Sequence, residues 1–161
     1  MTPALDPALD PELLDALMRA ALDEARAAPA HGDVPIGAVV ARIADGTVMA
    51  RRHNEREHLG DPTAHAEILA LRDAAKAAGT SHLDGHVLVS TLEPCPMCAG
   101  AVVLARLDAV AFGAADPNAG ALGSLYHLGS DPRLNHEVAV ASGVRADECA
   151  ALLQEFFAAR R

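Results

Sequence analysis

The chain has 161 residues and a formal net charge of −9 at pH 7. This length suits one domain that can bury a core without a structural metal or disulfides, and the acidic balance disfavours a protein whose whole surface binds nucleic acid. No apolar run approaches the ~18 residues of a membrane span, and residues 1–11 lack the basic and apolar segments of a secretory signal. We therefore expect a single cytoplasmic domain, residues 1–161, with residues 1–10 as a loose leader.

Four helices are expected along the chain, at residues 11–28, 62–78, 96–105 and 147–160. The first two follow an Asp-Pro pair, Asp10 with Pro11 and Asp61 with Pro62. Such a pair combines an N-cap with a proline at the first helical position, so it predicts a helix start. Gly79 closes the second helix, because glycine readily adopts the left-handed backbone of a helix C-terminus.

Five extended segments complete the pattern. Residues 36–43 and 47–52 flank Asp45 and Gly46, whose backbone freedom favours a tight hairpin turn. Residues 86–91 and 109–112 are continuous apolar runs on either side of a helix, which is typical of buried parallel strands. With a last strand at 137–141, we expect an α/β protein: a three-layer α/β/α sandwich with one mixed sheet of about five strands.

The residues that carry chemistry are concentrated in two short segments, His65-Ala66-Glu67 and Cys95-Pro96-Met97-Cys98. Cys95 and Cys98 are three positions apart at a helix start, so both sulfurs face one side, and the helix N-terminus favours thiolates. His65 and Glu67 can face one metal only if it lies beyond the N-terminal end of their helix. We expect one zinc ion per chain, held by His65, Cys95 and Cys98.

Three protein ligands leave a fourth tetrahedral position open, as in catalytic zinc sites, where a coordinated water has a pKa near ~7. Glu67 is not needed as a ligand, and we expect it to be the catalytic proton carrier. Two other interpretations stay open: a redox-active Cys-x-x-Cys pair, and a closed structural zinc site completed by Cys149 or another histidine.

The other candidate ligands have simpler explanations. Cys149 is expected to be a small buried residue of the core. His82, His86 and His136 are expected to form hydrogen bonds in loops or at strand edges, and His31 and His58 to be solvated.

At these residues the sequence resembles the bacterial tRNA-specific adenosine deaminases of the cytidine and deoxycytidylate deaminase superfamily. The resemblance rests on residues 61–67 and 91–101, continues at 112–114, 123–125, 134–136 and 147–153, and covers residues 16–161. It implies a cytidine-deaminase-like fold, a homodimer, and conversion of the wobble adenosine of a tRNA anticodon stem-loop to inosine. It also implies that Asn54 and Ala66 bind the substrate; for Asn54 in isolation, the alternative is an asparagine that caps a loop.

The sequence departs from the family pattern where basic residues are usual, with Ala115 in place of an arginine and Asn118 in place of a lysine. Three arginines beside Asn54 are candidate phosphate contacts or, equally, a solvated hairpin end: Arg51, Arg52 and Arg56. The nearest alternative function is a deaminase of a free base or nucleoside, guanine or cytosine, with the same zinc site. A non-catalytic zinc module is a further alternative, but it has no use for an acid such as Glu67 beside an open metal position.

Overall fold

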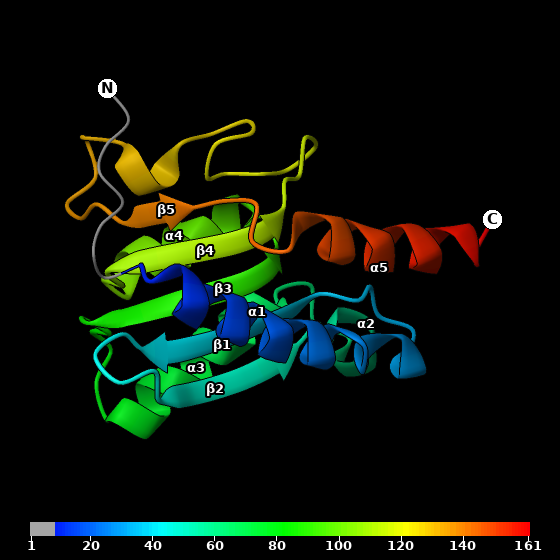
Figure 1. Cartoon of the computed structure of the whole chain (residues 1–161), viewed down its shortest axis with the longest axis horizontal. Coiled ribbons are helices and arrows are strands. Elements are labelled where there is room, and N and C mark those ends of the chain that lie inside the picture. Colours follow the sequence, from blue (N-terminus) through cyan, green and yellow to red (C-terminus); the bar gives the residue numbers. More distant parts are fainter. Residues whose placement is uncertain (1–8) are drawn as a thin grey trace.

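A mixed five-stranded sheet forms the centre of the computed structural model, which describes residues 9–161 (Figure 1). The strand order is β2-β1-β3-β4-β5. β1 pairs antiparallel with β2 and β3, whereas β3, β4 and β5 run parallel. The strands are β1 Gly37–Arg42, β2 Val48–His53, β3 His86–Leu92, β4 Ala109–Ala114 and β5 Ala139–Ala141. The predicted mixed sheet of about five strands is therefore confirmed.

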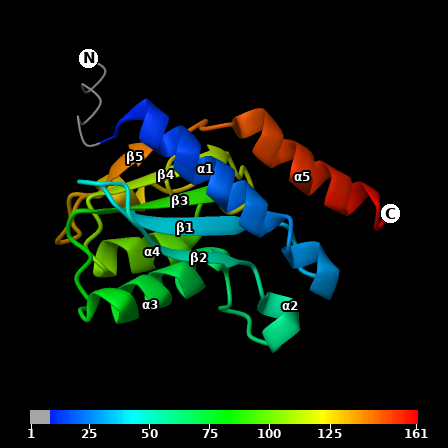
Figure 2. The same ribbon diagram turned by 60° about the horizontal axis from the view of Figure 1, so that its bottom comes forward.

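Helices cover both faces of this sheet (Figure 2). α1 (Pro11–Ala25) and α5 (Ala146–Ala158) lie on one face, and α3 (Ala66–Ala78) and α4 (Pro96–Leu104) on the other. Side chains alternate along the central strands, so Val39 packs toward α1 while Val40 belongs to the cluster with α3 and α4. This alternation follows from the two-residue period of a strand, and it confirms the three-layer sandwich.

The hairpin between β1 and β2 forms as expected. Gly46 has φ 72°, a left-handed backbone that suits glycine. The Asp45 carboxylate accepts a hydrogen bond from the backbone N–H of Thr47 at 3.0 Å, which closes the turn.

The second predicted helix start is wrong, because Asp61 and Pro62 belong to a turn instead. The Asp61 carboxylate accepts hydrogen bonds from the backbone N–H and the hydroxyl of Thr63, both at 2.8 Å. α3 begins at Ala66, and His65 is its N-cap residue in extended backbone. The short helix α2 (Arg56–Leu59), which was not expected, precedes this turn.

The N-terminal segment differs from the prediction in two details. α1 ends at Ala25, and a separate 3-10 helix, η1, spans Ala28–His31. Of the expected leader, residues 1–8 lie outside the described residues, whereas Leu9 is buried and Asp10 caps α1 by accepting the N–H of Glu12 at 3.1 Å.

Between β4 and β5 the chain forms a long excursion over α4, with one 3-10 turn, η2 (Leu128–Ser130). Among residues 9–161, no helix combines the length and the hydropathy needed to cross a membrane.

Candidate metal centre and active site

Two helix N-termini bring three potential metal ligands together. His65 and Cys95 are the N-cap residues of α3 and α4, and Cys98 lies in the first turn of α4. The Nδ1 atom of His65 lies 3.6 Å from the sulfur of Cys95 and 3.5 Å from that of Cys98. Tetrahedral zinc with bonds of ~2.0 Å to nitrogen and ~2.3 Å to sulfur places these atoms about 3.6 Å apart. The three side chains therefore fit one zinc ion.

The two sulfurs are strongly coupled. A hydrogen bond from the Cys98 thiol lowers the pKa of Cys95 to about 4, and the same contact raises the pKa of Cys98. In the metal-free site the proton therefore stays on Cys98, whose thiol lies 3.4 Å from Oε2 of Glu67. A divalent cation bound at this point displaces that proton, because thiolates rather than thiols are metal ligands.

Glu67 lies beside the ligands in the first turn of α3. It is 4% exposed, and its Oε2 is 3.4 Å from the sulfur of Cys98. Its Oε1 accepts a hydrogen bond from the hydroxyl of Ser90 in β3 at 2.9 Å. Desolvation by burial raises the pKa of Glu67, which suits a group that takes up and returns a proton near neutral pH.

A cavity of about 130 Å³ opens onto these side chains. Asn54 forms part of its wall, with Nδ2 3.4 Å from the carbonyl of Val34 and Oδ1 accepting the backbone N–H of Arg56 at 3.2 Å. The remaining wall includes both the polar and the apolar residues of the site, namely Ile36, His65, Ala66, Glu67, Leu92, Glu93, Cys95, Asp116 and Ala119.

Glu93 was missed by the sequence analysis, although an acid at the end of an apolar strand is an unusual residue. Its buried carboxylate accepts hydrogen bonds from the backbone N–H groups of Asp116, Leu122 and Ser124, and from the Ser124 hydroxyl. Burial raises the pKa of Glu93, but these hydrogen bonds outweigh it and the pKa is lowered. A Cβ on Gly120 would lie 2.3 Å from the same carboxylate. Glu93 thus fixes the loop of residues 116–124 at the cavity.

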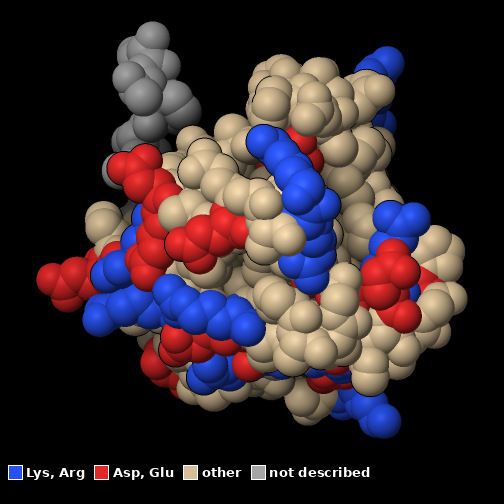
Figure 3. Space-filling view, turned by 90° about the vertical axis from the view of Figure 1, so that its right-hand side faces the viewer, with Lys and Arg blue, Asp and Glu red and all other residues tan. Residues whose placement is uncertain are grey.

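The three arginines near Asn54 differ in how free their side chains are to contact a phosphate. Arg52 is 28% exposed and pairs with Asp73 at 2.8 Å and Glu55 at 3.4 Å. Arg51 lies 3.7 Å from Glu24, whereas Arg56 begins α2 with an exposed side chain. Basic and acidic side chains are intermixed on the face of Figure 3, with no purely basic patch.

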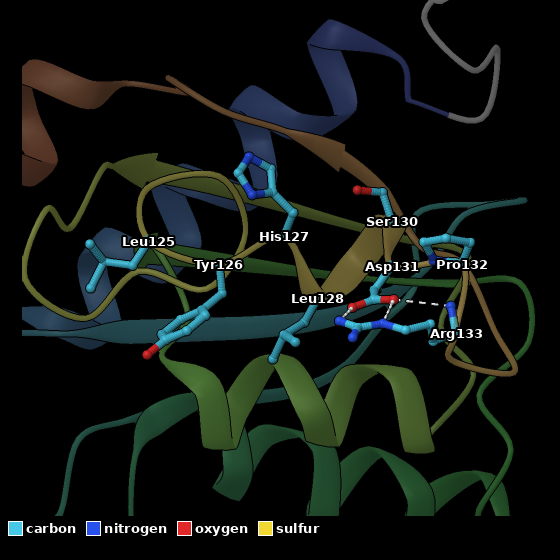
Figure 4. A pocket seen from close by; sticks show the side chains of 8 residues that line it. All are labelled: Leu125, Tyr126, His127, Leu128, Ser130, Asp131, Pro132 and Arg133. Atoms are coloured by element: carbon cyan, nitrogen blue, oxygen red, sulfur yellow. Dashed lines mark hydrogen bonds and ion pairs between the residues drawn. The ribbon is translucent and has the colours of Figure 1, made fainter.

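A second hollow, of about 470 Å³, lies over α4 and shares no residue with the metal site. Tyr126 and Leu128 point from its wall toward α4, and Arg133 pairs with Asp131 at 2.6 Å (Figure 4). This hollow and the metal ligands are therefore different features of the molecule.

The remaining cysteine and histidines follow the sequence analysis with one exception. Cys149 is buried against Gly113, and burial raises its pKa to about 11. His136 is hydrogen-bonded to the carbonyl of Leu107 at 2.7 Å, and His58 is exposed. The expectation that His31 is solvated was wrong, because its side chain is largely buried and bonded to Asp33.

Comparison with known proteins places this site in context. Residues 11–114 match the cytidine and deoxycytidylate deaminase zinc-binding region. The chain is 49% identical to a tRNA-specific adenosine deaminase of Bacillus subtilis over 140 residues, which is 87% of this chain and 86% of that protein. A solved structure from a study of A-to-I editing by tRNA:A34 deaminases at the wobble position is 44% identical with a TM-score of 0.81, covering 86% of this chain and 99% of that one. The guanine deaminase of Nitrosomonas europaea is 29% identical with a TM-score of 0.76, covering 98% of both chains.

Proposed function

Because the chain belongs to the cytidine and deoxycytidylate deaminase family, we propose that it is a zinc-dependent hydrolase that converts the wobble adenosine of a tRNA anticodon to inosine. The observation that carries the deaminase chemistry is the position of Glu67, buried beside three ligands that fit zinc. The choice of substrate is supported by relatives named tRNA-specific adenosine deaminases, among them those of Bacillus subtilis at 49% identity and Haemophilus influenzae at 43%.

Each residue of the site has a role in this reaction. His65, Cys95 and Cys98 hold the zinc, which when bound supplies a Lewis acid that activates water. Glu67 takes a proton from the water and gives it to N1 of the adenine ring. The water oxygen bonds to C6 as a hydroxyl, and Glu67 then takes the remaining proton of that hydroxyl and gives it to the exocyclic amine. The bond from C6 to that amine then breaks, and inosine and ammonia result.

The shape of the cavity supports a base that enters alone. At about 130 Å³ it is far below the ~300–1,000 Å³ of sites that enclose a whole drug-sized ligand. A stacked base hides its amine carbon, so the target adenosine has to be splayed out of the anticodon loop. We assign Asn54 to hydrogen bonding with this nucleoside, and Ala66 to the wall against its ring.

The RNA backbone outside the cavity requires basic contacts. Arg56 is the best placed of the candidate phosphate contacts, because its side chain is exposed next to Asn54. Arg51 and Arg52 are secondary candidates, since Glu24 in one case and Asp73 with Glu55 in the other already neutralise them.

We further propose a cytoplasmic homodimer. Support for a dimer comes from large apolar side chains exposed on and near α4, including Leu104 at 80% exposure together with Leu125 and Tyr126. Exposed large apolar side chains of this kind are typical of a surface that another chain covers. The cytoplasm is the expected location because the proposed substrate is tRNA.

A free-base deaminase is the second candidate, favoured by the likeness to the guanine deaminase of Nitrosomonas europaea over nearly the full chain. The test offers the purified protein an anticodon stem-loop with wobble adenosine and, in parallel, guanine, cytosine and adenosine. Inosine formed in the stem-loop only is expected. Ammonia released from guanine or cytosine, with no inosine in the stem-loop, would overturn the assignment and leave the zinc chemistry intact.

A further inference from the structure

Two partly buried histidines face each other outside the zinc site. His31 ends η1 and His53 ends β2, and their Nε2 atoms are 3.1 Å apart. Both side chains are 20% exposed. The segment after α1 and helix α2 meet in this part of the molecule (Figure 1), where the ring of His58 lies 4.7 Å from that of His31.

The other nitrogen of each ring determines what the facing nitrogens can be. Nδ1 of His31 lies 2.6 Å from the Asp33 carboxylate, and Nδ1 of His53 lies 3.2 Å from that of Glu24. Because ionised carboxylates only accept hydrogen bonds, both Nδ1 atoms carry the hydrogen. In neutral rings, both Nε2 atoms then carry a lone pair and no hydrogen. Two lone pairs at this separation repel each other unless a proton or a metal cation lies between them.

Asp33 fixes the orientation of the His31 ring, because its carboxylate is itself held in place by the backbone. It is buried, and its two carboxylate oxygens also accept the backbone N–H groups of Glu57 at 2.7 Å and His58 at 3.1 Å. An imidazole whose Nδ1–H is held by a fixed carboxylate presents its Nε2 in one direction. Histidines that bind metals are oriented in this way.

Distance and charge favour a metal cation at this point. Two nitrogens bound to tetrahedral zinc at ~2.0–2.1 Å are about 3.3 Å apart, close to the 3.1 Å between the two Nε2 atoms. The Oε1 atom of Glu55 lies 3.8 Å from Nε2 of His53. Three carboxylates lie near the rings, those of Asp33, Glu24 and Glu55. Among residues 9–161, only two arginines pair with these carboxylates, Arg51 with Glu24 and Arg52 with Glu55, so the net charge around the rings favours a cation.

We propose that His31 and His53 form a second binding site for a transition-metal cation of the zinc type, oriented by Asp33 and Glu24 and completed by water. Imidazole and oxygen ligands without sulfur make it weaker and more exchangeable than the site of His65, Cys95 and Cys98. An ion here links η1 to the residue before Asn54.

Metal content provides the first test. The zinc-loaded protein, His31→Gln and the control His86→Gln are dialysed against micromolar zinc and analysed for metal. His86 is a suitable control because its ring is hydrogen-bonded to the carbonyl of Asp84, at the end of the sheet opposite His53. Two zinc ions per chain are expected for wild type and the control, and one for His31→Gln. One zinc ion in all three proteins would overturn the proposal and leave a proton shared between the rings.

Cobalt spectroscopy and thermal unfolding keep the proposal testable if a variant folds poorly. Cobalt(II) added to the zinc-loaded wild type should give weak visible bands without the near-ultraviolet band of thiolate ligation. A ligand that binds only the folded chain raises Tm, so micromolar zinc should raise Tm of the zinc-loaded wild type and of His86→Gln, but not of His31→Gln. Equal Tm shifts in all three, or a thiolate band from the added cobalt, would contradict the second site.

Discussion

The hydroxyl of Ser90 bridges Oε1 of Glu67 and the carbonyl of Leu92, at 2.9 Å from each. A hydroxyl has one hydrogen to donate and can accept as well. When Glu67 is ionised, Ser90 donates to it; when Glu67 is protonated, Glu67 can donate to Ser90, whose hydrogen then turns to Leu92. Ser90 can therefore serve both protonation states of the carboxyl without movement of the strand.

Ser90→Ala should lower kcat about tenfold with little change in KM, because loss of one hydrogen bond to a charged group costs about 1.5 kcal/mol. Ser90→Thr keeps the hydroxyl and should restore most of the rate. Steady-state kinetics on the stem-loop measure both. A threonine variant as slow as the alanine variant would show that packing, and not the hydroxyl, is what the position supplies.

Glu67→Gln should keep the fold and the zinc but lose turnover. The amide has nearly the shape of the carboxyl and cannot carry a proton, and a positioned acid-base group contributes ~10²–10⁴-fold. Single-turnover assays and elemental analysis of the same preparation separate the two properties. Activity within a few-fold of wild type would exclude Glu67 as the proton carrier.

Cys98→Ala should lower the zinc content by about one ion per chain relative to wild type. The substitution removes one of only three protein ligands and leaves His65 and Cys95, which do not by themselves complete a stable tetrahedral site. Cys149→Ala is the matched control, because Cys149 is buried beside Gly113 and away from the metal ligands. If Cys98→Ala retains as much zinc as Cys149→Ala, Cys98 is not a ligand.

The sequence predicts the layers of this fold better than it predicts the details of the site. Apolar runs and the pattern of helices determine the sheet, because both are properties of consecutive residues. The Asp61 and Pro62 pair predicts a helix start but forms a turn, because the contacts that close the turn on Thr63 use the same residue types as a helix cap.

Contacts between distant segments explain what the sequence did not predict. Ser90 meets Glu67 across the interface between β3 and α3, and Glu93 meets Ser124 from a loop. No local pattern encodes such pairs. The metal ligands are the exception, because ligand type and spacing carry information even before the segments that hold them are brought together.

Glu93→Gln should lower the free energy of unfolding at pH 7 by about 2–3 kcal/mol, because the amide nitrogen cannot accept hydrogen bonds and leaves N–H groups unpaired. The folded pKa of Glu93 is lowered, so its stabilisation is complete above the unfolded value of about 4.3 and is lost as the pH falls through the folded pKa. Urea unfolding at pH 7 and at about pH 3 measures the difference. Glu57→Gln, an exposed carboxyl, is the control, and a Glu93→Gln deficit equally large at both pH values would contradict the assignment.

Arg56→Ala should weaken binding of the anticodon stem-loop without changing the chemical step. Each phosphate contact contributes a slope of about −0.7 to the logarithm of affinity against the logarithm of salt concentration for single strands. Loss of Arg56 should therefore raise KM several-fold at low salt and make the salt dependence shallower by about that slope.

Arg19→Ala removes the same charge from an exposed position on α1 and should change neither quantity. KM and kcat measured at several salt concentrations decide the matter. If Arg56→Ala and Arg19→Ala have equal effects, Arg56 contributes only through the net charge of the protein. If KM does not depend on salt concentration in any variant, arginine side chains do not contact the phosphates.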